Sequence, residues 1–328
     1  MNFLPSEVQL DIFKYLNSDQ LLFFQQTNLY FKTFINKYKE ELARKKFCFI
    51  EIRYVNENYL NDHIFFKPEP KLYDFQLSKK LEKKWKYAIE ESIPTFLTTT
   101  EKQLTIAALI VEPTNKFYLQ FPKYPKNIEE MKITRYLLEK LFKCTFEAAH
   151  FNFIIFNPKM IQLLFDENKT NIPLQIHSQR TFLINDNKQN KYLLKFVLNH
   201  LISNEFNVWP SNRQNLDVAF KILTTGGNKF PKVCCDDTIY KPTFYNLILR
   251  HIETSTECSE IVKEISLRIR RPLILIERAE NIEIKIEKNN NVKSTKYQLS
   301  NKYNPEITFS VHIKENFLYN DVEIKRIN

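Results

Sequence analysis

The stretch Leu4-Pro5-Ser6-Glu7-Val8-Gln9-Leu10-Asp11-Ile12-Phe13-Lys14-Tyr15-Leu16 predicts the first element of the chain. Val8, Ile12 and Leu16 recur every four residues, which places them on one face of an α-helix. Leu10 and Phe13 widen that face. The sequence therefore predicts an amphipathic helix over residues 6–16.

Two more short helices are predicted directly after it. Asn17 can cap a new helix while Gln20, three residues later, bonds back to the cap, as in a capping box. The second helix then opens with four large apolar residues, 21–24, and the third carries Phe31, Phe34 and Ile35 at helical spacing. Four consecutive apolar residues cannot share one stripe of a helix, so residues 21–24 must be covered from more than one side.

This N-terminal segment is predicted to need a partner. Fewer than roughly 40 residues seldom form a stable core alone, so the partner is either the rest of the chain or another protein. In residues 1–38 three lysines balance three acidic residues, whereas the whole chain carries a formal net charge of +10. We therefore expect apolar contact to drive the association. The alternative interpretation is an ordinary N-terminal helical hairpin of a larger domain.

The pattern resembles an F-box. The resemblance is carried by Leu4-Pro5-x-Glu7-Val8-x-Leu10-x-Ile12-Phe13-x-Tyr15-Leu16, by Asp19-x-Leu21-Leu22, and by Phe31 followed by Phe34-Ile35. It implies a three-helix module that binds the small adaptor subunit of an SCF-type ubiquitin ligase and, through it, a cullin scaffold. The adaptor contacts that it implies are Leu4, Pro5, Val8, Ile12, Leu16, Leu21, Leu22 and Phe31. Two positions depart from the family pattern, because Thr27 stands where valine is common and Phe31 where tryptophan is common.

The sequence predicts an α/β fold for the remainder. We assign residues 1–45 to the F-box, 46–100 to a linker with a basic helix, and 101–328 to an α/β region that recognises a substrate. Strands are predicted at 47–52, 106–111, 117–121, 151–156, 174–184, 273–276, 282–286 and 307–313, and helices at 79–93, 128–146, 158–165, 192–202, 211–223, 244–252 and 258–267. Our first choice is a degenerate, leucine-rich-repeat-like strand–helix array with a β-rich C-terminal part. A single closed α/β domain with a β-rich cap is the alternative.

The whole chain also resembles the expanded F-box proteins of nematodes. This resemblance is carried by its Asn/Lys/Phe-rich texture and by stretches such as residues 133–142 and 279–284. It implies the substrate-recognition subunit of a ligase, which holds a protein target and performs no bond chemistry itself. An F-box scaffold acting outside a ligase is the alternative within the same family.

Composition excludes several enzyme classes at the level of motifs. The chain has two glycines, Gly226 and Gly227, so dinucleotide turns, phosphate loops and nucleophile elbows are absent from its sequence. We interpret this pair as the stop of a helix, where a positive φ is wanted. Cys234-Cys235 lacks zinc spacing, and Cys258 with His251 is a weak nucleophile–base candidate. We therefore predict no enzyme activity, no cofactor and no metal.

Charge and cysteine content limit which partners and which cellular compartment we expect. Five cysteines do not form an obvious disulfide framework, and no leader or membrane span is evident, so we expect a cytoplasmic or nuclear protein. The positive charge and the lysine-rich helix at 79–93 leave nucleic-acid binding as the alternative function. The favoured partner is an acidic protein segment, held by strand residues within 151–156, 174–184 and 273–286.

Overall fold

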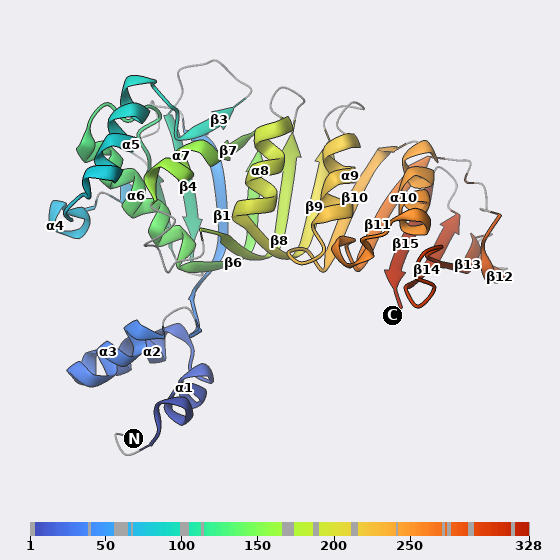
Figure 1. The fold of residues 1–328 in the computed structure, drawn as a ribbon, viewed down its shortest axis with the longest axis horizontal. Coiled ribbons are helices and arrows are strands. Elements are labelled where there is room, and N and C mark those ends of the chain that lie inside the picture. The colour runs from blue at the N-terminus through green and yellow to red at the C-terminus, as the bar shows by residue number, and fades with distance from the viewer. Residues whose placement is uncertain are drawn as a thin grey trace.

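Three short helices form the N-terminal part of the computed structural model (Figure 1). They are α1 (Ser6–Lys14), α2 (Ser18–Thr27) and α3 (Leu29–Lys37). The predicted capping box is confirmed, because Asn17 accepts from the Gln20 backbone while the Gln20 side chain accepts from the Asn17 backbone. The structure describes residues 4–38, 41–55, 65–66, 68–98, 105–112, 115–165, 174–185, 190–210, 216–240, 242–270, 273, 277–287, 292–315 and 319–327.

The helical module has a core of its own. Phe13 is fully buried, and the rings of Phe24, Phe31 and Phe34 lie 5.4, 5.7 and 5.5 Å from its ring. The cluster also includes the buried side chains Leu10, Leu21, Ile35 and Leu42. Aromatic edge contacts at these separations add to the stabilisation from buried area. The module therefore extends through Leu42, just before the first strand begins.

A mixed sheet forms most of the remaining chain. The described residues place 13 strands in the order β12-β13-β14-β15-β11-β10-β9-β8-β6-β1-β4-β5-β2. At its centre, neighbouring strands run parallel: β1 (Lys45–Val55), β6 (Cys144–Asn152), β8 (Ile176–Asn185), β9 (Leu201–Pro210), β10 (Lys232–Tyr240) and β11 (Glu264–Arg270). From β6 onward these strands follow one another in both sequence and space.

One α-helix lies in each connection between the successive parallel strands from β6 to β11. These helices are α7 (Pro158–Leu164), α8 (Asn190–His200), α9 (Leu216–Thr225) and α10 (Pro242–Thr254). They lie side by side along one face of the sheet (Figure 1). Parallel strands need such crossover connections, so the strand–helix alternation follows from the topology.

Antiparallel pairs flank the parallel centre on both sides, and the short strand β2 then pairs in parallel with β5 at the edge. On the C-terminal side lie β12 (Glu280–Glu287), β13 (Val292–Ser300), β14 (Thr308–Glu315) and β15 (Tyr319–Arg326). On the other side lie β4 (Thr105–Val111), β5 (Lys116–Gln120) and the short β2 (Phe65–Phe66). The strands β3 (Phe96–Thr98) and β7 (Ile154–Phe156) form a separate pair, and α4 (Pro70–Tyr73), α5 (Lys79–Glu90) and α6 (Ile128–Phe142) lie near this end.

The main core lies between the sheet and its helices. In β11, for example, Ile265, Leu267 and Ile269 are buried against the helices, whereas Ser266 and Arg268 alternate with them and point to the opposite face. Residues 46–98, which the sequence analysis assigns to a linker and a basic helix, also contribute to this core, for example through Trp85 of α5. No helix in the described ranges combines the length and apolar character needed to cross a membrane.

One predicted helix is wrong and another ends two residues earlier than predicted, and both differences have a physical explanation. Residues 258–267 space their apolar side chains like a helix, yet they form a 3₁₀ turn at Cys258–Glu260 followed by β11. Within β11 buried and less buried side chains alternate, as expected for a strand. The apolar residues Ile261 and Val262, which come just before β11, hide this alternation in the sequence. The helix predicted at 192–202 ends at His200, and β9 begins at Leu201 with no glycine or proline between them.

Smaller corrections concern element ends. The helix predicted over 128–146 ends at Phe142, and the strand predicted over 151–156 is interrupted at Phe153, whose φ is 61°. The start of the helix predicted at 211–223 and most of the strand at 273–276 lie outside the described residues. Strands β10, β13 and β15 were not predicted, because lysine, serine, aspartate and asparagine interrupt their apolar pattern.

The glycine pair follows α9 as predicted, but for a different reason. No glycine in the described ranges has a positive φ. A Cβ on Gly226 would lie 2.5 Å from the carbonyl oxygen of Ile222, and one on Gly227 would lie 2.6 Å from that of Ile261. Close backbone approach therefore requires glycine at these two positions.

Candidate protein-binding surfaces

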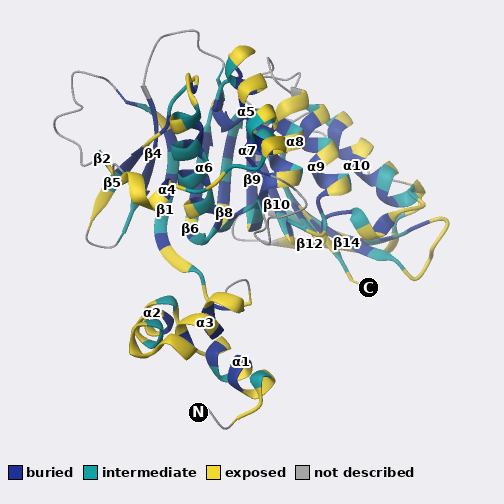
Figure 2. Cartoon of the chain, turned by 60° about the vertical axis from the view of Figure 1, so that its left-hand side comes forward, coloured by how far each residue is buried: buried dark blue, intermediate teal, exposed yellow. Residues whose placement is uncertain are grey.

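The N-terminal module exposes apolar side chains that its own core does not use. Leu22 is 53% exposed and Phe23 is 69% exposed on α2, although the neighbouring Leu21 is buried. Leu4 and Val8 are also exposed, and Figure 2 shows exposed and buried positions along the module helices. The predicted conflict in residues 21–24 is thus resolved within this chain by leaving two of the four side chains in solvent.

A buried amide fixes the start of this surface. Gln9 is 2% exposed, and its Nε2 donates to the backbone oxygen of Leu4 at 2.6 Å. Its Oε1 accepts from the hydroxyl of Tyr30 on α3 at 2.8 Å. Because both ends of the amide are satisfied, Gln9 holds the Leu4-Pro5 opening against the third helix. Sequence reasoning missed Gln9, since glutamine on an amphipathic helix normally indicates the solvent face.

The eight predicted adaptor contacts fall into three groups. Leu4, Pro5, Val8 and Leu22 are exposed, and Ile12 and Leu16 are half-buried. Leu21 and Phe31 are buried in the module core, where they stabilise the three helices. The predicted adaptor contacts do not include Phe23, Leu29 or Tyr15, which are among the most exposed apolar side chains of the module.

A second surface is the sheet face that carries no helices, which we call the open face. On this face, the ring centre of His150 on β6 lies 4.6 Å from the ring centre of Phe49 on β1 and 4.6 Å from that of Phe182 on β8. Phe182 contacts Trp209 of β9 at 6.0 Å, and Trp209 is 41% exposed. Four rings from four neighbouring strands therefore form a continuous aromatic row, ending in an indole accessible to solvent.

A row of alternating charges runs beside the aromatic row. The register places Arg180, Glu205, Lys232, Glu264 and Lys325 opposite one another on β8, β9, β10, β11 and β15. The Lys232 ammonium lies 3.5 Å from both Glu205 and Glu264, and Lys325 lies 3.5 Å from Glu264. Cross-strand pairs of opposite charge stabilise a sheet, but a pair whose side chains are this exposed to solvent adds little to the free energy of unfolding.

This charge row bears on the partner predicted from net charge. The lysines of the row have carboxylates beside them, so the open face is not a simple basic patch. Of the strand ranges predicted to bind a target, only 174–184 contributes to both rows, through Arg180 and Phe182. Glu264 was missed because the start of β11 was predicted as a helix, and Glu205 and Trp209 were missed because no strand was predicted where β9 lies. The spacing of Ile202, Phe206 and Val208 at multiples of two residues is the sequence signal that could have found β9.

The nucleophile and metal candidates have structural roles. The Cys258 thiol donates to the Ser255 carbonyl at 3.2 Å and accepts from Asn301 at 3.1 Å, and burial raises its pKa. His251 instead packs against the ring of Phe220 at 5.4 Å. Cys234 and Cys235 are adjacent on a strand, so they point to opposite faces. Within the described ranges, His, Cys, Asp and Glu form no group of three that could hold a metal ion.

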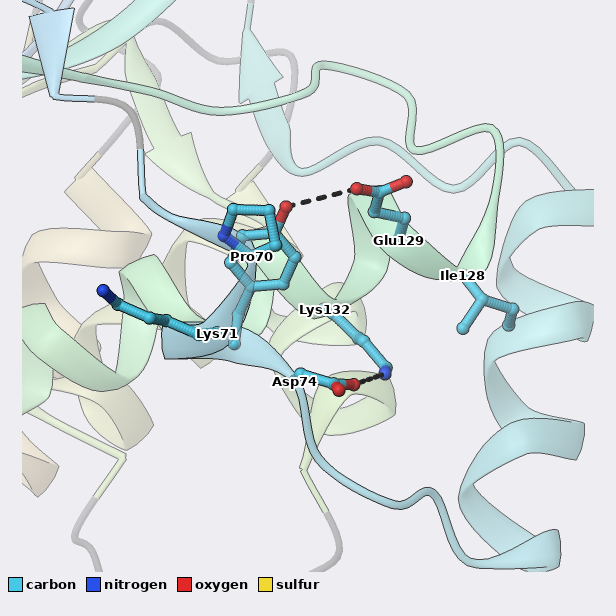
Figure 3. A pocket seen from close by; sticks show the side chains of 7 residues that line it. Pro70, Lys71, Asp74, Ile128, Glu129 and Lys132 are labelled. Atoms are coloured by element: carbon cyan, nitrogen blue, oxygen red, sulfur yellow. Dashed lines mark hydrogen bonds and ion pairs between the residues drawn. The ribbon is translucent and has the colours of Figure 1, made fainter.

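A pocket of about 640 Å³ lies between α4 and α6, and Figure 3 shows its lining. Tyr73 donates to Glu129 at 3.2 Å, and Lys132 donates to Asp74 at 2.8 Å. Burial, with the hydrogen bond to Glu129, raises the pKa of Tyr73. Because these polar groups pair across the pocket, they connect α4 and the residue after it to α6 and present no activated group to a ligand.

Comparison with known proteins identifies one family model. A domain of unknown function, DUF8381, matches residues 66–209, which is less than half of the chain. The match spans β2 to β9, includes Phe182 and Trp209 of the aromatic row, and leaves out the three N-terminal helices. Comparison with curated proteins and with solved structures gives no match.

Proposed function

We propose that this chain is the substrate-recognition subunit of an SCF-type E3 ubiquitin ligase. Its N-terminal module is an F-box that binds the adaptor, and its sheet region holds a protein target. The observation that carries the proposal is the module itself: three helices with their own aromatic core and with Leu4, Val8, Leu22 and Phe23 left in solvent. Several large apolar side chains exposed on one small module are typical of a protein interaction site.

The sheet region supports the second half of the proposal. Its parallel strands follow in order with one helix each, which favours a degenerate leucine-rich-repeat-like array over a closed α/β domain. Arrays of this kind bind partners on an extended strand surface. The open face offers Trp209 as an aromatic anchor beside the charge row, a combination found at the centres of protein interfaces. The target expected from the net charge is an acidic segment, with the lysines of the row exchanging their glutamate partners for it.

The proposed mechanism requires no catalytic residue in this chain. A receptor that binds adaptor and target together raises the effective concentration of a target lysine near a ubiquitin-loaded enzyme. The polar groups of the pocket at α4 and the thiol of Cys258 are already satisfied by neighbours, which fits a binding role.

The proposal is tested by capture of the SCF adaptor with the purified full-length chain. Leu22→Glu places a charge in the apolar surface without touching the module core, and it should weaken capture by about tenfold or more because a buried charge is left unpaired. Leu247→Glu is the matched control, since Leu247 is also a helical leucine and 45% exposed, on α10.

Two results would contradict the docking proposal. One is equal capture by the parent chain and Leu22→Glu, and the other is equal loss in both glutamate variants. If the adaptor is captured but no ubiquitin transfer to any bound protein can be reconstituted, the chain acts as a scaffold outside a ligase.

A further inference from the structure

The strand β12 ends the sheet and leaves its outer edge open. It pairs with β13 alone in the described sheet, so its other edge presents unpaired backbone donors and acceptors. Figure 1 shows β12 at the far end of the sheet, beyond the last helix α10. Long, regular open edges readily pair with another strand.

The side chains of β12 continue the apolar face of the sheet past that helix. Ile284 lies in register with Thr295, Ile313 and Val322, which are 2%, 5% and 1% exposed. Ile282, Ile284 and Ile286 themselves are 49%, 54% and 64% exposed. Three alternating isoleucines at an open edge favour pairing that would cover them.

The opposite side of β12 carries two opposite charges. Glu283 lies opposite Lys296, in the same open-face row as His312 and Glu323. Lys285 lies on the same side of the strand as Glu283, because the two residues are two positions apart. Their charged groups lie 3.8 Å from each other. The irregularity of this strand falls between Glu280 and Glu283, so residues 283–287 pair regularly with β13.

Charge and side-chain direction together select a partner and a register. Suppose that β12 of a second copy pairs antiparallel with β12 about a two-fold axis. Isoleucines then lie opposite isoleucines only if even-numbered residues pair with even-numbered residues. Centring the axis on Glu283 or Lys285 sets like charges opposite each other. Centring it on Ile284 sets Glu283 opposite Lys285 twice, Ile282 opposite Ile286 twice, and Ile284 opposite itself.

We propose that the chain forms a homodimer through antiparallel pairing of two β12 strands centred on Ile284. The pairing joins the two sheets into one continuous sheet and removes an open edge from each copy. A two-fold contact of this kind is self-complementary, which matches the sequence Ile282-Glu283-Ile284-Lys285-Ile286. The dimer carries two open faces and two N-terminal modules, independently of what those surfaces bind.

Charge reversal tests the proposal with the full-length chain in sedimentation-equilibrium experiments. Glu283→Lys and Lys285→Glu each replace two attractive pairs with two repulsive ones and should weaken dimerisation on the order of tenfold. The double variant, Glu283→Lys with Lys285→Glu, restores both attractive pairs and should recover the parent association. A mixture of the two single variants should form a heterodimer, because each variant then meets its complement.

Both substitutions lie on exposed side chains, so circular dichroism should show unchanged folding. The proposal is overturned if the parent chain remains monomeric over the whole accessible concentration range. It is equally overturned if the single variants dimerise like the parent, because another surface would then form the dimer. Failure of the mixture to associate would overturn the register centred on Ile284.

Discussion

Burial affects the titration of the five histidines that lie within the described residues. Desolvation is the largest influence on His150, His177, His200, His251 and His312, and it lowers the pKa of each. The effect is largest at His177, where burial and the nearby Arg44 lower the pKa to about 4. The buried Nε2 of His177 has no hydrogen-bond partner among the described residues, so a proton there would not be stabilised.

Acidification should therefore destabilise the fold through His177. An unfolded histidine titrates near pH ~6.5, whereas folded His177 takes up its proton near pH 4. The unfolded chain thus binds more protons between these values, and the stability from the neutral side chain, full above ~6.5, falls as the pH drops toward 4. We expect His177→Gln to lose less unfolding free energy than the parent between pH 7 and pH 5. Urea titrations at both pH values measure this, and equal losses in the two proteins would contradict it.

At the scale of elements, caps are where sequence and structure agree best. Asn157 caps α7: it precedes Pro158 at the first position of the helix and accepts from the backbone of Lys159 at 3.0 Å. Its Nδ2 also donates to the carbonyl of Pro94 at 2.8 Å, and Asn157 is 4% exposed. This cap therefore also connects α7 to the segment before β3, which sequence alone did not show.

Loss of this cap should cost more than loss of an ordinary one. Asn157→Ala removes the capping bond, which is worth about 1 kcal/mol, and it also leaves the Pro94 carbonyl without its donor. We expect the free energy of unfolding to fall by about 2–3 kcal/mol in total. Asn127→Ala, which removes the exposed cap of α6, is the matched control and should cost about 1 kcal/mol. Chemical denaturation of the two variants compares them, and similar losses would show that the Pro94 contact contributes nothing.

The elements that sequence predicts are those whose signal is local. The helix cap at Asn17 and the alternation of Ile282, Ile284 and Ile286 depend on residues within a few positions, and the structure has the expected elements there. Strand β9 follows α8 with no break, and β11 follows a turn whose buried residues mimic helical spacing. Tertiary pairing with neighbouring strands decides those two segments, and one sequence does not show that pairing.

The same limit applies to the candidate surfaces. The apolar positions of the N-terminal module were predicted from its pattern, but their division into core and surface was not. Leu21 and Leu22 are the same residue type, and only the direction in which each side chain points makes one buried and the other exposed. The open-face rows assemble residues from strands far apart in sequence, from Phe49 to Lys325. Such rows exist only once the order and register of the strands are fixed.

At the scale of the whole molecule, the two surfaces lie on two parts of the chain with separate cores. The module core and the main core share no residue, Leu22 lies on α2 of the module, and Trp209 lies on β9 of the sheet. Substitutions on one surface should therefore leave binding at the other unchanged, as expected for sites without shared contacts. This independence is what a receptor that connects a ligase to a target requires.

Proximity labelling in cells with the full-length chain and two variants tests this account most directly. Leu22→Glu should lose the SCF adaptor and the cullin scaffold and keep the remaining partners, whereas Trp209→Ala should keep the adaptor and cullin and lose the target. Both positions are exposed, so the variants should unfold at the parent temperature. The account is contradicted if neither the adaptor nor a cullin is labelled by the parent chain, or if either variant loses both sets of partners or neither.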